Sequence, residues 1–108
     1  MAMSDLEERV FSAEMRLGWK PSQVALQVPI RGGRNVKGGL IVDQVVYRPH
    51  PLPVFINGDY WHRDAGQEVL ERAAVWQEFG ALPVVIWGHE IPNEEQTLAV
   101  VLERIGRP

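Results

Sequence analysis

The chain has 108 residues, of which 45% are hydrophobic and 23% are charged, a composition typical of one soluble globular domain. A formal net charge of −3 argues against strong nonspecific binding to nucleic acid, because such binding requires many lysines and arginines. Cysteine, a membrane-spanning apolar run of ~20 residues and a secretory signal are all missing from the sequence, so we expect a cytoplasmic protein without a membrane partner.

The first half of the chain predicts one helix followed by strands. Apolar residues recur at helical spacing behind an acidic first turn, and they predict a helix over 5–17. Alternating apolar residues then predict a short strand over 24–28. Residues 31–39 contain four glycines and three cations, which is typical of a loop or a wide hairpin turn. The apolar run 40–47 predicts a strand that is buried on both faces.

The second half predicts the order strand, helix, strand, helix. Residues 48–53 are expected to be a connection, because their prolines cannot donate to a β-ladder. The next strand covers 54–56, and apolar spacing then predicts a helix over 64–79. A buried strand over 83–87 follows, and a last helix begins after Pro92.

The helix predicted over 64–79 combines apolar spacing with an acidic balance. Its apolar positions are Val69, Leu70, Ala73, Val75 (or Ala74) and Trp76. Its charged positions are Asp64, Glu68, Glu71, Arg72 and Glu78. Because the helix is net acidic, we expect it to face solvent or a protein partner and not to lie on DNA. The four tryptophans of the chain are predicted to be core residues rather than platforms for base stacking.

The order of these elements predicts the fold class. A long helix between two apolar strands implies a right-handed crossover, and therefore parallel pairing of the strands that it joins. We expect a single domain over 1–108, of the α/β (α+β) class, in which a mixed β-sheet carries helices on both faces.

Two neighbouring strands carry the polar residues that indicate chemistry. Asp43 follows the run Gly38-Gly39-Leu40-Ile41-Val42, and the second strand ends in Asn57-Gly58-Asp59-Tyr60-Trp61-His62. A carboxylate beside a cluster of oxygen and nitrogen ligands can hold a hard divalent cation and a water next to it.

On these motifs the chain resembles the restriction-endonuclease-like (PD-(D/E)XK) superfamily, and within it the branch similar to very-short-patch-repair endonucleases. The stretches that carry the resemblance are Val42-Asp43-Gln44, Phe55-Ile56-Asn57-Gly58-Asp59-Tyr60-Trp61-His62, Trp76-Gln77-Glu78-Phe79-Gly80 and Val84-Val85-Ile86-Trp87. The resemblance implies an αβββαβ core, here with a C-terminal helix added, and an endonuclease that uses Mg²⁺ to hydrolyse phosphodiesters of DNA.

The resemblance also assigns roles to residues. Asp43 matches the metal-binding aspartate, with the Ile56 carbonyl and either Asp59 or His62 beside it. His62 also matches the histidine that closes the turn, and Glu7 (or its neighbour Glu8) matches the acid of the first helix. Asn57 departs from the family pattern, which has an acid or a histidine there, and an amide cannot take a proton from water.

Each of these residues also has a purely structural reading. Asp43 can stand at an exposed strand end, and Asn57-Gly58 is a common tight-turn pair. His62 can cap the next helix, and Glu7 can serve the helix dipole. Asp59 can be a solvated turn residue.

The cations of the 31–39 loop are the candidates for binding DNA, since glycines allow close approach and arginine pairs with phosphate. They are Arg31, Arg34 and Lys37. A flexible, solvated connector is the alternative for this loop.

Two hypotheses follow for the whole chain. The first is a metal-dependent DNA endonuclease, which as a double-strand cutter would commonly be a homodimer. The second is a catalytically inactive nuclease-fold module, a structural or interaction protein of a phage or mobile element that would be virion-associated. The acidic balance, Asn57 and the lack of a lysine near the turn favour the second.

Overall fold

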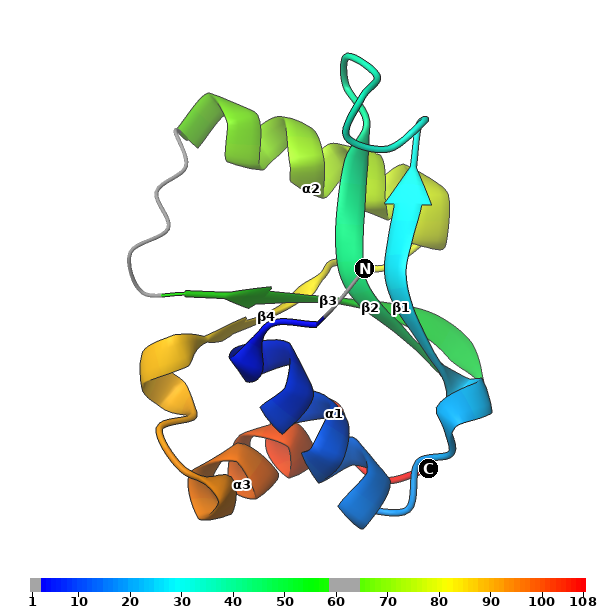
Figure 1. Cartoon of the computed structure of the whole chain (residues 1–108). Coiled ribbons are helices and arrows are strands. Elements are labelled where there is room, and N and C mark those ends of the chain that lie inside the picture. Colours follow the sequence, from blue (N-terminus) through cyan, green and yellow to red (C-terminus); the bar gives the residue numbers. More distant parts are fainter. Residues whose placement is uncertain (1–2, 59–64) are drawn as a thin grey trace.

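The structure is a computed structural model that describes residues 3–58 and 65–108 (Figure 1). In these ranges the chain forms a mixed four-stranded sheet and three α-helices, in the predicted order. The helices and strands are α1 (Asp5–Arg16), β1 (Val24–Ile30), β2 (Leu40–Arg48), β3 (His50–Asn57), α2 (Ala65–Phe79), β4 (Val84–Trp87) and α3 (Glu94–Arg104). Two short 3₁₀ turns, η1 (Pro21–Gln23) and η2 (Gly88–Glu90), lie before β1 and after β4.

The strands lie in the order β1-β2-β3-β4. β2 pairs antiparallel with both β1 and β3, whereas β3 and β4 pair in parallel from Val54↔Val84 to Asn57↔Trp87. The parallel pair is the one that α2 connects, so the α/β class with a mixed sheet is confirmed.

The expectation that residues 48–53 form only a connection is wrong, because β3 begins at His50 and pairs with β2 from Arg48↔His50 onward. Backbone N–H groups of alternate strand residues point to opposite sides. Since the Ile56 N–H points toward β2, where Asp43 accepts it, the nitrogens of Pro51 and Pro53 point the other way. β4 pairs with β3 only from Val54 onward. The N–H groups that the two prolines lack would therefore have no acceptor on a neighbouring strand.

The sheet separates two layers of unequal size (Figure 1). α1 and α3 cover one face, and their core is the larger of the two. Its buried residues are Val10, Ala13, Trp19, Val24, Val46, Val54, Ile56, Ile86, Ile91, Val101 and Ile105. α2 covers the other face, with a smaller core that consists of Ile30, Leu40, Val42, Val45, Phe55, Ala74 and Val75.

The helix α2 buries less of its apolar surface than its sequence predicts. Ala74 and Val75 are its buried residues, whereas Val69, Leu70 and Trp76 are 66%, 71% and 54% exposed. The prediction that Trp76 is a core residue is therefore wrong.

The other tryptophans differ in how far they meet the same prediction. Trp19 is buried and donates its indole N–H to the carbonyl of Gly106 at 2.8 Å, and Trp87 is half-buried. Trp61 lies outside the described residues.

The first residues of α1 and α3 are capped by polar side chains. The Ser4 hydroxyl accepts the N–H of Glu7 at 3.2 Å, and the Asn93 side chain accepts the N–H of Gln96 at 2.8 Å. Within the described ranges, no helix has the length and hydropathy needed to cross a membrane.

Candidate functional site

A polar cavity of about 520 Å³ lies where β2 and β3 meet the first half of α2. Its polar side chains come from four separate segments: Arg34, Asp43, Asn57, Gln67 and Glu71. The remaining wall is formed by Gly39, Leu40, Ile41, Phe55, Ile56 and Gly58. Of the residues that the sequence predicts to form the site, the cavity thus brings Asp43, Ile56, Asn57 and Arg34 together.

Asp43 is held at the point where the β2–β3 ladder ends. The last paired residues are Gln44 and Val54, and the Asp43 carboxylate accepts the next available N–H, that of Ile56, at 2.8 Å. This side-chain bond takes the place of a ladder bond, so it fixes the orientation of the carboxylate beside the cavity. β3 supplies both the donor and the following residue, Asn57.

Two further lining residues, Gln67 and Glu71, come from α2. They are four residues apart and therefore lie on the same side of the helix. Glu71 shares that side with Val75, which is buried against the sheet. Glu71 thus brings a second carboxylate to the cavity that holds Asp43.

Sequence reasoning missed Glu71 because it counted this residue only among the charges of an acidic helix. The available signal was its spacing: Glu71 precedes Val75 by one helical turn, so it must lie toward the sheet whenever Val75 does.

The three cations of the basic loop, residues 31–39, have different surroundings. Arg34 lines the cavity, whereas the Arg31 guanidinium donates to the side chain of Gln77 on α2. Lys37 is exposed and is not part of the cavity wall. The loop folds back tightly, since a Cβ at Gly39 would collide with the carbonyl oxygen of Gly33.

Glu7 does not line this cavity. It lies on α1, which covers the face of the sheet opposite to α2 (Figure 1), and its carboxylate accepts from the Gln27 side-chain N–H at 2.9 Å. Gln27 adopts the left-handed conformation (φ +52°) between the pairs Leu26↔Gln44 and Val28↔Val42. Gln27 thus lies opposite Asp43 in the sheet, and Glu7 contacts Gln27. Glu7 itself lies on the other face of the sheet from the cavity.

Asp59 and His62, which the sequence also predicts to belong to the site, lie outside the described residues.

The residue after Asp43 belongs to a buried polar pair on the α1 side. Gln44 donates to the Glu14 carboxylate at 2.8 Å, and both side chains are fully buried. Burial raises the pKa of Glu14 to about 7, although the hydrogen bond from Gln44 opposes that shift.

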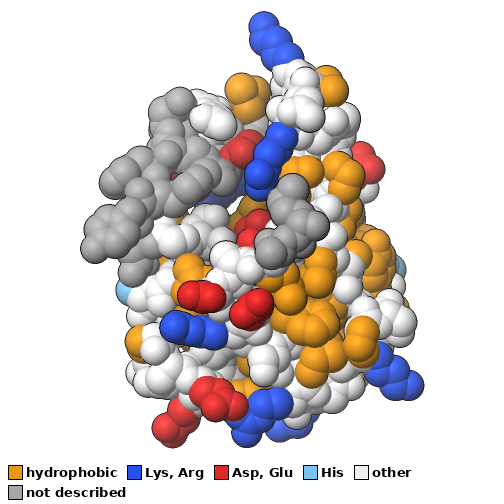
Figure 2. All heavy atoms as spheres, viewed as in Figure 1, with side chains coloured by type: hydrophobic (Ala, Val, Ile, Leu, Met, Phe, Trp, Pro, Cys, Tyr) orange, Lys and Arg blue, Asp and Glu red, His pale blue; other side chains and the backbone are white. Residues whose placement is uncertain are grey.

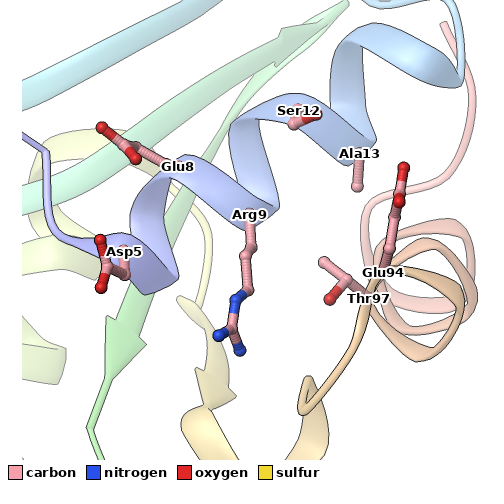
Figure 3. A pocket seen from close by; sticks show the side chains of 7 residues that line it. All are labelled: Asp5, Glu8, Arg9, Ser12, Ala13, Glu94 and Thr97. Atoms are coloured by element: carbon pink, nitrogen blue, oxygen red, sulfur yellow. The ribbon is translucent and has the colours of Figure 1, made fainter.

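A second cavity, of about 450 Å³, lies between α1 and α3 (Figure 3). It is lined by Asp5, Glu8, Arg9, Ser12, Ala13, Glu94 and Thr97. Arg9 points away from α1 toward the segment that precedes α3, where it donates to the Ile91 carbonyl at 2.9 Å. This guanidinium thus joins α1 to the segment that precedes α3.

Charged side chains of both signs are interspersed over α1 and α3 in the lower part of the molecule (Figure 2). On the described part of this face the basic side chains are scattered and do not form a continuous stripe (Figure 2). This pattern differs from the basic stripe that a protein uses to follow a nucleic-acid backbone.

No protein-family model, no curated protein and no solved structure matches this chain. The resemblance to restriction-endonuclease-like proteins stays a prediction from the sequence motifs.

Proposed function

We propose that this protein is a metal-dependent DNA endonuclease that acts at the cavity between β2, β3 and α2. The observation that carries the proposal is the lining of one cavity by the carboxylates of Asp43 and Glu71 together with the guanidinium of Arg34. Carboxylates suit a divalent cation, and arginine suits a phosphate oxygen.

The donor set fits Mg²⁺. Among the described residues, no three acidic or histidine side chains form a group able to hold a metal. Mg²⁺ does not require three, because it is usually bound by one or two carboxylates and keeps several waters. Asp43 and Glu71 would hold the ion, with the Asn57 amide and the Ile56 carbonyl as further oxygen ligands. When bound, Mg²⁺ would stabilise charge on a phosphoryl oxygen and lower the pKa of its water.

The residues that line the cavity would have separate roles in the reaction. Asp43 is kept in one orientation by the Ile56 N–H, which limits the reorganisation needed to bind a cation. Arg34 would pair with a phosphate oxygen of the substrate at the cavity. Glu71 supplies the proton-accepting carboxylate that the amide of Asn57 cannot provide.

The test is cleavage of supercoiled and linear DNA in Mg²⁺ or Mn²⁺. Asp43→Asn and Glu71→Gln should each lower the rate by two orders of magnitude or more, because each removes a charge that the transition state needs. Glu78→Gln is the matched control: it removes the same charge from α2 at an exposed position outside the cavity wall. Equal activity of Glu71→Gln and Glu78→Gln would contradict the proposal.

A second candidate is an inactive nuclease-fold module that serves as a structural or interaction protein of a phage or mobile element. Two observations favour it: the amide at Asn57, and the outward face of α2, which exposes Leu70 and Trp76. Wild-type protein that neither cleaves DNA nor binds Mg²⁺ or Mn²⁺ would select this candidate.

A further inference from the structure

A further cavity, of about 510 Å³, lies at the C-terminal end of β2. It shares no lining residue with the polar cavity that holds Asp43. Its wall contains the two arginines Arg48 and Arg107, and among the described residues that line it there is no aspartate or glutamate. In a chain of net charge −3, this local excess of positive charge makes the cavity suited to an anion.

Both guanidinium groups keep donors for a ligand. Arg48 donates through Nη1 to the carbonyl oxygen of Ile105, at the C-terminal end of α3. This bond fixes the orientation of the Arg48 side chain and uses one of its five N–H groups. Arg107 is exposed, and within residues 3–58 and 65–108 it has no acidic partner. Capping of α3 explains the position of Arg48 but does not explain why Arg107 lines the same cavity.

The segment that carries Arg107 is held in place on both sides of this residue. Before it, the Gly106 carbonyl accepts the indole N–H of Trp19 at 2.8 Å. After it, the Pro108 ring lies next to Gly18, where an added Cβ would be 3.6 Å from Pro108 Cγ. These contacts place Arg107 at the cavity wall before a ligand binds, which lowers the entropic cost of binding.

An aromatic ring completes the cavity beside the cations. Tyr47 precedes Arg48 in β2, lines the cavity and is 44% exposed. Pro49 and Pro108 add rigid apolar rings to the same wall. An exposed aromatic ring next to guanidinium groups is a surface on which a nucleic-acid base can stack.

We propose that this cavity binds a nucleoside 5′-monophosphate, either free or as the 5′-phosphorylated end of a strand. A phosphate monoester carries a charge of about −1.5 to −2 at pH 7, so it matches two guanidinium groups better than a carboxylate with a single charge does. Arg48 and Arg107 would bind the phosphate, and the base would stack on Tyr47. Because neither Asp43 nor a metal takes part, the proposal is independent of the proposed nuclease activity.

Isothermal titration calorimetry with AMP, adenosine and ribose 5-phosphate tests the proposal. EDTA in the buffer removes divalent metal, so that the polar cavity cannot hold a nucleotide through an ion. AMP should bind at one site per chain, and adenosine and ribose 5-phosphate should each bind at least about tenfold more weakly, because each lacks one of the two recognised groups. No binding of AMP up to millimolar concentration would overturn the proposal, as would equal binding of ribose 5-phosphate.

Substitutions then assign the binding to this cavity. Arg107→Gln should weaken AMP binding about tenfold or more, because hydrogen bonds to a charged group are lost, and it should leave the circular dichroism spectrum unchanged. Tyr47→Leu should weaken the binding of AMP but not that of ribose 5-phosphate, whereas Tyr47→Phe should keep both. Arg72→Gln is the control, since it removes the same charge from an exposed position on α2 outside the cavity. Equal weakening by Arg107→Gln and Arg72→Gln would overturn the proposed site.

An oligonucleotide with and without a 5′-phosphate distinguishes the two sources of the ligand. Tighter binding than AMP that requires both the 5′-phosphate and Arg107 would assign the cavity to the end of a strand. Binding of AMP at least as tight as that of the phosphorylated oligonucleotide would assign it to a free nucleotide. None of these measurements involves metal or cleavage, so failure here is distinguishable from failure of the proposed nuclease.

Discussion

Glu14 carries the clearest chemical consequence at the scale of single residues. Its side chain is fully buried on the side of α1 that faces the sheet, and one of its oxygens accepts a hydrogen bond from Gln44. Among the described residues, Glu14 Oε2 and Gln44 Oε1 have no hydrogen-bond partner. Protonation of Glu14 removes a buried charge and turns an acceptor into a donor, so the neutral acid suits this site better than the carboxylate.

Stability should therefore fall as the pH rises from about 4.5 to about 7. In that window the folded protein keeps a proton on Glu14, whose pKa is about 7, while the unfolded chain has lost it, since the ordinary value is 4.5. The loss should reach roughly 3 kcal/mol and level off at higher pH. Glu14→Gln should abolish this dependence.

Urea unfolding at pH 5, 6, 7 and 8 measures this effect, with Glu8→Gln as an exposed control on the same helix. Parallel profiles for wild type and Glu14→Gln would show that Glu14 does not titrate in this range.

Some contacts of single residues follow from the sequence, and others depend on packing that the sequence does not reveal. Asp43 and Asn57 were expected near one another because neighbouring strands carry them, and both line the polar cavity. Glu71 joins them only through the way α2 packs on the sheet, and no local motif encodes that. The buried partner of Glu14 is likewise set by packing, since nothing near Gln44 in the sequence indicates it.

At the scale of elements, Arg104 joins α3 to the edge of the sheet. It donates to both oxygens of Glu90 at 2.6 Å and to the Val85 carbonyl of β4 at 3.0 Å. The hydrogen bonds from Arg104 lower the pKa of Glu90 to about 2. The ion pair thus adds stability above pH 4.5, the ordinary value, and loses it as the pH falls toward 2.

Arg104→Met should lower the free energy of unfolding at pH 7 by about 1–2 kcal/mol, because a bidentate pair with limited exposure is lost. The difference from wild type should shrink toward pH 2, where Glu90 takes up a proton. Denaturant titrations at pH 7 and pH 2.5 measure it. An equal difference at both pH values would mean that Arg104 acts through packing alone.

The basic loop gives a second prediction at this scale. Arg34 lines the cavity while Lys37 does not, so Arg34→Ala should weaken DNA binding and reduce the salt slope by about 0.9, the value of one phosphate contact. Lys37→Ala, in the same loop, is the control and should change neither. The two variants are compared by binding assays across salt concentrations. Equal effects of both variants would mean that the loop attracts DNA only through its net charge.

Element boundaries were predictable where the apolar pattern was strong: a helical period in α1 and α3, and a continuous apolar run in β2. β3 was predicted too short because Pro51 and Pro53 suggest a connection, whereas they fall on a side of the strand that needs no donors. The outward side of α2 could not be assigned from spacing alone. Its apolar residues, among them Val69 and Val75, point in different directions around the helix, and only packing decides which side is buried.

At the scale of the whole molecule, the sheet divides a well-packed layer from a thinner one. α1 and α3 bury most of the core, whereas α2 is held by few buried side chains and yet supplies part of the cavity wall. Regions with few buried apolar contacts open at lower free energy.

Native-state hydrogen exchange should therefore be faster for the amides of α2 than for those of α1 and α3. Uniform protection of the three helices would contradict the unequal layering.

A thermal-unfolding titration with Mg²⁺ and Mn²⁺ shows whether Asp43 and Glu71 together bind a divalent cation. Preferential binding to the folded state should raise the Tm of the wild type at millimolar metal. Asp43→Asn and Glu71→Gln should each lose that rise, while Glu78→Gln should keep it. A wild-type Tm that does not respond to either metal, or a rise that survives both substitutions in the cavity, would mean that Asp43 and Glu71 do not form a metal site.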